Sequence, residues 1–164
     1  MSIQALTGED VIKLTKKVID DSGNAAFTST VLNDFADGDI GTIEFPNDIS
    51  GVKTGKGGNS VFAFNATGLN AKMSIRIIRG STDDKYIQTR LAEWIKDASL
   101  FTLITGELTK KVGDGSGKLT SDKYTLSGGT FQKLPEVKSN VEGDTDQAVV
   151  VYNLTFAKVV RTIT

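Results

Sequence analysis

Hydrophobic and polar residues alternate along much of the chain, most regularly in the segment KMSIRIIR that begins at Lys72. In an extended chain Met73, Ile75 and Ile77 fall on one side, whereas Lys72, Arg76 and the serine between them fall on the other. Successive side chains of a strand point to opposite faces of the sheet. The segment therefore predicts a strand with one buried and one solvated face.

A second alternating run, DQAVVVYNLTFAKVV, lies near the C-terminus. One of its faces carries mostly large apolar residues, namely Ala148, Val150, Tyr152, Leu154 and Phe156. The other face carries smaller residues, namely Val149, Val151, Asn153, Thr155 and Ala157. Because neither face is strongly charged, we expect both faces of this strand to be covered, although unequally.

Further strands are predicted where short apolar runs are bounded by glycine, aspartate or asparagine. These strands are Asp10–Lys17, Gly41–Phe45, Ser60–Asn65, Leu100–Leu108 and Lys123–Leu134. Between residues 15 and 36 the turn signal DDSGN favours a hairpin, with a short helix over Ser29–Phe35 as the alternative. Many short strands with turn signals between them are typical of an antiparallel sandwich or barrel.

One segment, STDDKYIQTRLAEWIKD, breaks the period of two and predicts a helix over about residues 81–97. Its apolar residues recur at helical spacing, namely Ile87, Leu91, Trp94 and Ile95. Its ends carry helix-terminal signals, namely Ser81 or Thr82 as cap, Asp83 and Asp84 in the first turn and Lys96 in the last. The expected fold is mainly β, an antiparallel β-sandwich or half-barrel with one amphipathic α-helix, in a single domain over residues 1–164.

Composition restricts the chemistry of this chain of 164 residues. Histidine and cysteine are both absent, which removes the usual thiolate nucleophile, the commonest zinc ligands and the side chain that titrates near neutrality. The net charge of -1 provides no global basic field for nucleic acid. No segment resembles a signal peptide or a membrane helix. We therefore expect a soluble protein made in a cytoplasm, with no enzymatic activity, cofactor or metal.

Two glycine-rich segments resemble ligand-binding loops without matching them. In GVKTGKGGNS only three residues separate Gly51 from Gly55, whereas a phosphate-binding loop requires four, and VGDGSGKLT lacks both the first glycine and the final hydroxyl. The run from Asp37 begins like a calcium-binding EF-hand, but Gly41 and Thr42 stand where a ligand and the required glycine belong. Nucleotide and calcium sites are therefore not expected.

The same two segments, Gly51–Asn59 and Lys110–Asp122, are expected to be loops without structure of their own. Long loops of this kind are often functional, so we predict contacts with a partner. The candidates are Gly51, Lys53, Thr54, Gly55, Lys56, Gly57, Asn59, Lys110, Lys111, Asp114, Lys118 and Asp122. Small polar strand residues, including Thr42, Glu44, Asn153 and Thr155, form faces that can contact another subunit, border a water-filled passage or simply be solvated.

The run from Asp37 to Ile87 resembles the tail tube proteins of contractile-tailed bacteriophages. The resemblance lies in EFPND, VKTGKGGN, FAFN followed by a TG turn, and RIIRGSTDDKYI, and it covers about a third of the chain closely. Beyond Asp97 the strand pattern is compatible with this family but includes no diagnostic motif. The hairpin expected between residues 15 and 36 is an addition to the family pattern.

This resemblance implies a fold similar to the tube proteins of type VI secretion. Six copies would close into a ring with a continuous inner β-barrel, and stacked rings would form the conduit for genome ejection. The partners implied are copies of the chain itself and the tail sheath, baseplate and tail terminator proteins. DNA would pass through without specific binding, in a virion assembled in the host cytoplasm. The two glycine-rich segments would contact neighbouring subunits, and Thr42, Glu44, Asn153 and Thr155 would face the lumen.

Two other hypotheses remain open at this point. The chain could form the ring or tube of a secretion or injection system, which would share the same fold and physics. It could also be a monomeric β-rich module that binds a sugar or a protein. Size in solution separates the monomeric module from both tube hypotheses.

Overall fold

The computed structural model describes residues 3–164 and confirms a mainly β fold, with a single α-helix in this part of the chain. The main antiparallel sheet contains β1 (Ala5–Leu6), β2 (Val11–Ile19), β3 (Ala25–Val31), β4 (Gly41–Glu44), β7 (Ala71–Ile78), β8 (Ile104–Gly113), β9 (Leu119–Lys133) and β10 (Val149–Ile163). A separate hairpin consists of β5 (Ser50–Thr54) and β6 (Ser60–Phe64). The helical elements are α1 (Thr82–Lys96) and the 3-10 turns Ala66–Leu69 and Thr145–Ala148.

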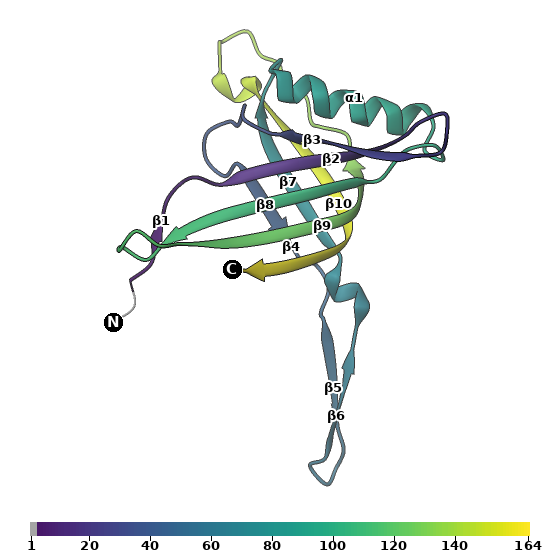
Figure 1. Ribbon diagram of the computed structural model, residues 1–164, viewed down its shortest axis with the longest axis vertical. Coiled ribbons are helices and arrows are strands. Elements are labelled where there is room, and N and C mark those ends of the chain that lie inside the picture. The colour runs from purple at the N-terminus through teal and green to yellow at the C-terminus, as the bar shows by residue number, and fades with distance from the viewer. Residues whose placement is uncertain (1–2) are drawn as a thin grey trace.

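The strands of the main sheet follow the order β3-β2-β8-β9-β10-β7-β4, and β1 pairs with the end of β8. The sheet bends at β10, whose first half pairs with β7 and whose second half pairs with β9 (Figure 1). The bend brings β4 across the core to β2. The two strands are so close there that a Cβ added to Gly41 would lie 2.7 Å from Cδ1 of Ile12. The sheet therefore curls into a half-barrel around its core.

The chain between β3 and β4 closes this half-barrel on one side. The main-chain N–H of Leu32 donates to Ile12 O at 2.9 Å, and the N–H of Ala36 donates to Arg76 O at 3.1 Å. One short segment thus bonds to β2 and to β7, which are separated by three strands in the sheet order. These bonds satisfy backbone groups that the curled sheet would otherwise leave without partners.

The core confirms the alternation that the sequence predicts. On β7, Met73, Ile75 and Ile77 are buried, and on β10 the residues Val150, Tyr152, Leu154 and Phe156 are buried. The intervening residues of β10 from Val149 to Thr155 are partly buried, so its second face is covered less completely than its first. The main hydrophobic cluster also includes Ile12 and Leu14 of β2 and Leu126 of β9.

Helix α1 lies within the predicted bounds and packs on the core with Ile87 and Leu91. Ser81 is its cap, since the Ser81 side chain accepts from the N–H of Asp84 at 3.2 Å. The predicted apolar stripe is wrong at its end, because Ile95 is 64% exposed. Trp94 takes the inward position and packs edge-on against Phe101, while Ile95, one position further round the helix, points away.

The hairpin expected between residues 15 and 36 is present, as β2 and β3 joined by a turn in which Asp20 accepts from the N–H groups of Ser22 and Asn24. The alternative helix over Ser29–Phe35 is wrong, because its first residues belong to β3.

The strand predicted from Leu100 begins only at Ile104, and the strand predicted from Lys123 begins at Leu119. The first end is misplaced because the mostly apolar run Leu100–Leu103 follows the turn after the helix and forms no strand. The second end is misplaced because the polar residues before Lys123 pair across the sheet with β8.

Candidate functional site

The sequence predicted that Gly51–Asn59 would be a loop without structure of its own. This prediction is wrong, because the segment forms most of a β-hairpin. Gly51 to Thr54 belong to β5, and Gly55–Asn59 is the turn into β6. The N–H of Gly55 donates to Asn59 O at 2.8 Å, and Gly58 has a φ of +89, which favours glycine. Figure 1 shows this hairpin projecting from the body of the protein, away from the helix.

The register of this hairpin separates its side chains into two different faces. Val52 is paired with Phe62, and Ser50 with Phe64, so the two phenylalanines and the valine share one face. The exposed fractions of Val52, Phe62 and Phe64 are 60%, 76% and 72%. We call this face, Val52, Phe62 and Phe64, the apolar hairpin face. The opposite face carries Gly51 with Ala63 and Lys53 with Val61.

An isolated two-stranded hairpin is only marginally stable in water. Here the residues of both strands are exposed, so the body of the protein does not cover either face. Burying the three large apolar side chains of the apolar hairpin face would contribute about 5 kcal/mol, at roughly 1.5–3 kcal/mol for each. Contact with another surface that buries these side chains would therefore stabilise the hairpin.

The base of the hairpin is held firmly, in contrast to its shaft. The N–H of Asn65 donates to Ile49 O at 2.7 Å, and the Asn65 side chain accepts from the hydroxyl of Thr67 at 2.9 Å. Gly68 packs so closely on the backbone of Asp48 and Ile49 that a Cβ would lie 2.8 Å from Asp48 O. The hairpin thus leaves the body in a defined direction.

The second predicted loop, Lys110–Asp122, is also a hairpin, formed by the ends of β8 and β9. Two of its charged residues are paired within the chain, since Lys110 Nζ lies 2.7 Å from Asp10 Oδ2 and Arg161 donates two bonds to the Asp122 carboxylate, at 2.8 and 2.9 Å. The hydrogen bond from Arg161 lowers the pKa of Asp122.

At the tip of this second hairpin, the side-chain oxygen of Asp114 accepts from Ser116 and from the N–H of Lys118. The hydrogen bonds from Ser116 lower the pKa of Asp114. Contact roles for Lys110, Lys111, Asp114, Lys118 and Asp122 stay predictions, but three of these five side chains already have partners in the chain.

The four residues predicted to face a lumen lie on one surface. Thr42 of β4 and Asn153 of β10 both pair with Ser74 of β7, and Glu44 and Thr155 both pair with Lys72. The Ser74 hydroxyl donates to Asn153 Oδ1 at 3.0 Å. These two rows lie on the face of the sheet opposite Met73, Ile75 and Leu154. The structure therefore brings the four candidates together, on a small and polar sheet face.

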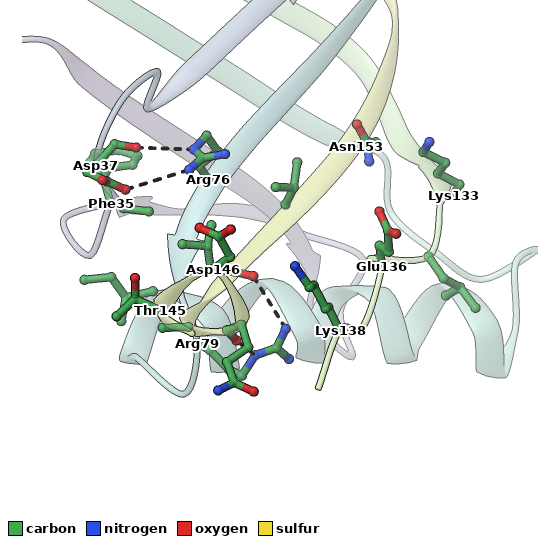
Figure 2. Close-up of a pocket in the computed structure, with 17 residues that line it drawn as sticks. Phe35, Asp37, Arg76, Arg79, Lys133, Glu136, Lys138, Thr145, Asp146 and Asn153 are labelled. Carbon is green, nitrogen blue, oxygen red and sulfur yellow. Dashed lines mark hydrogen bonds and ion pairs between the residues drawn. The ribbon is translucent and has the colours of Figure 1, made fainter. Parts of the chain in front are cut away.

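A groove that sequence reasoning missed continues from this face toward the helix, and we call it the arm groove. One wall is Phe35–Asp37, and the other is the arm, residues 134–148, as Figure 2 shows for Glu136, Lys138 and Asp146. The floor includes Ile78, Val149 and Val151, and the cavity volume is about 960 Å³. The partly apolar second face of β10 was its only sequence signal, because the walls come from separate segments.

Bonds from β7 and from Arg79, the residue directly after it, hold both walls of the arm groove. Arg79 Nε donates to Gln147 O at 2.8 Å, and the Arg79 N–H donates to Ala148 O, also at 2.8 Å. On the other wall Arg76 Nε donates to Asp37 O at 3.3 Å (Figure 2). The groove is thus a formed feature of the fold.

Other strongly interacting polar groups bind the fold together. Tyr152 Oη donates to Asp84 Oδ1 at 2.5 Å, and burial together with this carboxylate raises the pKa of Tyr152. Glu107 accepts from Lys123 and Lys13, which lower its pKa. Residues 3–164 contain no group of three or more acidic side chains placed to hold a metal ion. These interactions connect neighbouring elements and do not converge on a cavity.

Among the described helical segments, none is long and apolar enough to cross a bilayer. Comparison with the sequence profiles of known protein families gives no match. Comparison with curated proteins likewise gives none.

Proposed function

We propose that this chain is a structural subunit that associates with copies of itself into rings, and that the rings stack into the tail tube of a contractile-tailed bacteriophage. The apolar hairpin face carries this proposal, since Val52, Phe62 and Phe64 project on a hairpin with a fixed base and an uncovered shaft. In the assembled virion the tube would be the conduit for the genome. It would contact the sheath, the baseplate and the tail terminator.

Two open strand edges support association into a ring. The outer edge of β3 and the free edge of β10 beyond Phe156 have no strand partner within residues 3–164. They are the two margins of the five strands β3-β2-β8-β9-β10, and β3 carries neither charge nor proline to block pairing. Joining different edges of successive copies makes a heterologous contact, which closes into a ring when the rotation allows.

The direction of the strands constrains such a ring. Neighbouring strands alternate in direction across the five, so β3 and β10 run the same way. Copies related by rotation about a ring axis keep that direction, so β10 of one copy would pair in parallel with β3 of the next. Antiparallel pairing of one edge with the same edge of another copy, β3 with β3 or β10 with β10, would instead relate two copies by a two-fold axis and stop at a dimer.

The polar face with Thr42, Glu44, Asn153 and Thr155 suits a passage for DNA. Its hydroxyl and amide groups are short. Of its cations, Lys72 lies beside the carboxylate of Glu44, Arg76 lies 3.8 Å from the carboxylate of Asp37, and Lys133 has no ion pair among residues 3–164. Tight binding of DNA depends on several lysine or arginine contacts with phosphates. A conduit requires weak binding, and the net charge of -1 agrees with this requirement.

The tube of a secretion or injection system would use the same surfaces, and neighbouring genes for capsid and sheath or for a secretion ATPase would separate the two.

A monomeric binding module is the second candidate, and the arm groove favours it. Its cavity of about 960 Å³ lies at the upper end of the range for small-molecule sites.

Size in solution tests the proposal directly. Purified protein at increasing concentration should pass from 17.5 kDa monomers to rings or filaments in sedimentation velocity and negative-stain microscopy. A species that stays at 17.5 kDa at every concentration, together with saturable binding of a small ligand, would replace the tube by the binding module.

A further inference from the structure

We infer that β10 of one copy joins β3 of the next in a single register, in which Phe27 of β3 lies beside Val160 of β10. This inference rests on the proposed function and specifies the contact between neighbouring copies within a ring. The contact uses the two free edges, namely the edge of β3 that faces away from β2 and the edge of β10 beyond Phe156 that faces away from β9. Figure 1 shows them at opposite margins of the five strands.

Alternate residues of β3 direct their backbone N–H and C=O groups toward its free edge. The N–H of Leu32 donates to Ile12 O at 2.9 Å, and the N–H of Asp20 donates to Asn24 O at 3.0 Å. Asn24 and Leu32 therefore face β2, as do the even-numbered residues between them, because backbone direction alternates along a strand. The residues that face the free edge are Ala25, Phe27, Ser29 and Val31.

The second half of β10 shows the same alternation. The N–H of Ser121 donates to Thr164 O at 2.9 Å, and the N–H of Thr164 donates to Ser121 O at 3.0 Å. Thr164 thus faces β9, and so do the even-numbered residues before it, since the pairing of β10 with β9 is regular from Leu154 onward. The residues that face the free edge are Ala157, Val159, Arg161 and Ile163.

The two faces of the sheet restrict how these edges can join. Thr30 pairs with the buried Leu14, so even-numbered residues of β3 lie on the core face and odd-numbered residues on the opposite face. On β10 the buried Val159 lies on the core face, so Lys158, Val160 and Thr162 lie on the opposite face. A junction that keeps both faces continuous therefore sets odd-numbered residues of β3 beside even-numbered residues of β10.

Parallel hydrogen bonding imposes the same restriction. In a parallel pair, a residue whose N–H and C=O point at the partner strand bonds to the two residues that flank the one opposite, and the opposite residue points away. The odd-numbered residues of β3 face the free edge, so they must stand opposite even-numbered residues of β10, which face β9. Backbone and side chains agree, and the registers that remain differ by steps of two residues.

Two of these registers bring most of β3 against the free edge of β10. The first places Phe27 beside Val160 and Ala25 beside Lys158. The second is shifted by two residues and places Phe27 beside Lys158 and Ala25 beside Phe156. Phe156 already pairs with Ala71 of β7, so the position that Ala25 would take in the second register is occupied.

Side-chain pairing also favours the first register. Phe27 is 70% exposed and Val160 is 46% exposed in the single chain, and the first register removes both from water together. It also sets Ser29 beside Thr162. Aromatic side chains beside β-branched ones and hydroxyls beside hydroxyls are favourable cross-strand pairs. The second register would instead set each apolar side chain beside a polar one, Phe27 beside Lys158 and Val160 beside Ser29.

Disulfide formation tests the register, because the chain has no cysteine of its own. Opposite residues of neighbouring strands are about 4.8 Å apart, which a disulfide spans, whereas residues offset by two are about 8 Å apart, which it does not. The test variant combines Ser29→Cys with Thr162→Cys, and the matched control combines Ser29→Cys with Val160→Cys. After oxidation of assembled tubes, we expect a ladder of linked copies on a denaturing gel from the test variant and none from the control.

A proline on the free edge provides an independent readout. Ser29→Pro removes an N–H that faces the free edge, so the monomer loses no ladder hydrogen bond while the junction does. Ser29→Ala is the matched control, because both variants lose the hydroxyl contact with Thr15 and only the proline lacks the N–H. We expect Ser29→Pro to raise the critical concentration for assembly about tenfold or more, Ser29→Ala to leave it near wild type, and circular dichroism to show both variants folded.

The outcomes separate the register, the junction and the tube. A ladder from the Val160→Cys control in place of the test variant overturns the register. A dimer from Ser29→Cys alone shows two β3 edges paired about a two-fold axis and overturns the junction. Tubes that form without a disulfide in either double variant, or that Ser29→Pro does not weaken, also overturn the junction and leave the tube intact. Wild-type protein that stays monomeric at every concentration overturns the proposed function itself.

Discussion

The two glycine-rich hairpins of this protein have similar sequences and very different surroundings. Residues Gly51–Asn59 and Lys110–Asp122 both combine glycine, lysine and small polar residues, and both join antiparallel strands. The strands β5 and β6 pair only with each other, whereas β8 and β9 are flanked by β1, β2 and β10. A glycine turn therefore indicates where the chain reverses, and the neighbours of the strands decide whether the reversal is exposed or part of a sheet.

Charge separates these hairpins less completely. In the second hairpin Lys110 and Asp122 have partners inside the chain, namely Asp10 and Arg161, whereas the structure of residues 3–164 shows no ion pair for Lys111 or Lys118. In the first hairpin, the structure of residues 3–164 shows no ion pair for either lysine. Charges that the fold does not use remain available to another molecule. The comparison supports the first hairpin as the surface for assembly and the second as part of the framework.

The largest predicted effect is on the framework that supports β8 and β9. Phe156 is 1% exposed and packs against Gly129 of β9 and Gly106 of β8. Phe156→Ala should lower the free energy of unfolding by about 3–5 kcal/mol, since it leaves a cavity in the core. Urea denaturation measures this loss, and a loss below about 1 kcal/mol would show that the core is not organised around this ring.

The next effect concerns the base of the projecting hairpin. Gly68→Ala should lower the free energy of unfolding by about 1–3 kcal/mol, because its Cβ would overlap the backbone beside Ile49, which cannot move as a side chain can. Thermal unfolding measures the change, and Gly51→Ala, whose Cβ would meet nothing within 4 Å, is the matched control. Equal effects of the two substitutions would contradict a fixed base.

A smaller effect depends on pH and belongs to the framework. Hydrogen bonds from Lys123 and Lys13 lower the folded-state pKa of Glu107 from its usual 4.5. A lowered carboxyl pKa adds stability above the unfolded-state pKa, and this stability is lost as the pH falls through the folded-state value. Glu107→Gln should cost less than about 1 kcal/mol at pH 7.

The cost of Glu107→Gln should disappear below the folded-state pKa, as measured by urea titrations at several pH values. Thr109→Gln, on the same strand, is the control. If the difference in free energy of unfolding between Glu107→Gln and wild type grew as the pH fell, the pH dependence would have the opposite sign. That result would refute a lowered pKa of Glu107 in the folded state.

The smallest effect on stability should accompany a large effect on assembly. Phe62→Ser removes an exposed ring, so the free energy of unfolding of the monomer should change by less than about 0.5 kcal/mol. The loss of about 1.5 kcal/mol or more of burial at the interface should raise the critical concentration for tube formation about tenfold. Sedimentation against concentration measures this, and Leu100→Ser, which removes another exposed apolar side chain, is the control. A destabilised monomer with unchanged assembly would place Phe62 in the framework.

The sequence predicts the parts of the fold in which local pattern and tertiary environment agree. β7 alternates between Met73, Ile75 and Ile77 and polar residues, and the helix has Ser81 as its cap and the buried pair Ile87 and Leu91, as its spacing requires. The strand ends at Gly113 and Leu119 were missed, because threonine, lysine and serine pair there without a buried face. Polar strand ends have no pattern of burial that could identify them.

The candidate site could likewise be predicted only in part from the sequence. The alternation on β4 and β10 already selects Thr42, Glu44, Asn153 and Thr155 as residues of polar faces, but only the pairing of both strands with β7 places them on one surface. The apolar face of β6 could not be recognised from the sequence, because apolar residues stand on both faces of the strand, Val61 on one and Phe62 and Phe64 on the other. All three are exposed. The arm groove joins segments more than a hundred residues apart in the chain, so no local pattern could predict it.

By itself the sequence determined that the chain would form strands and one helix, and which side of β7 and of α1 would be buried. These outcomes follow from periodicity, because a period of two or of 3.6 residues decides how side chains are distributed around an element. Only the tertiary structure decided that one glycine-rich hairpin projects while the other lies in the sheet, and that a groove faces away from that projection. Those features depend on which strands become neighbours, and neighbours are chosen by packing across the whole core.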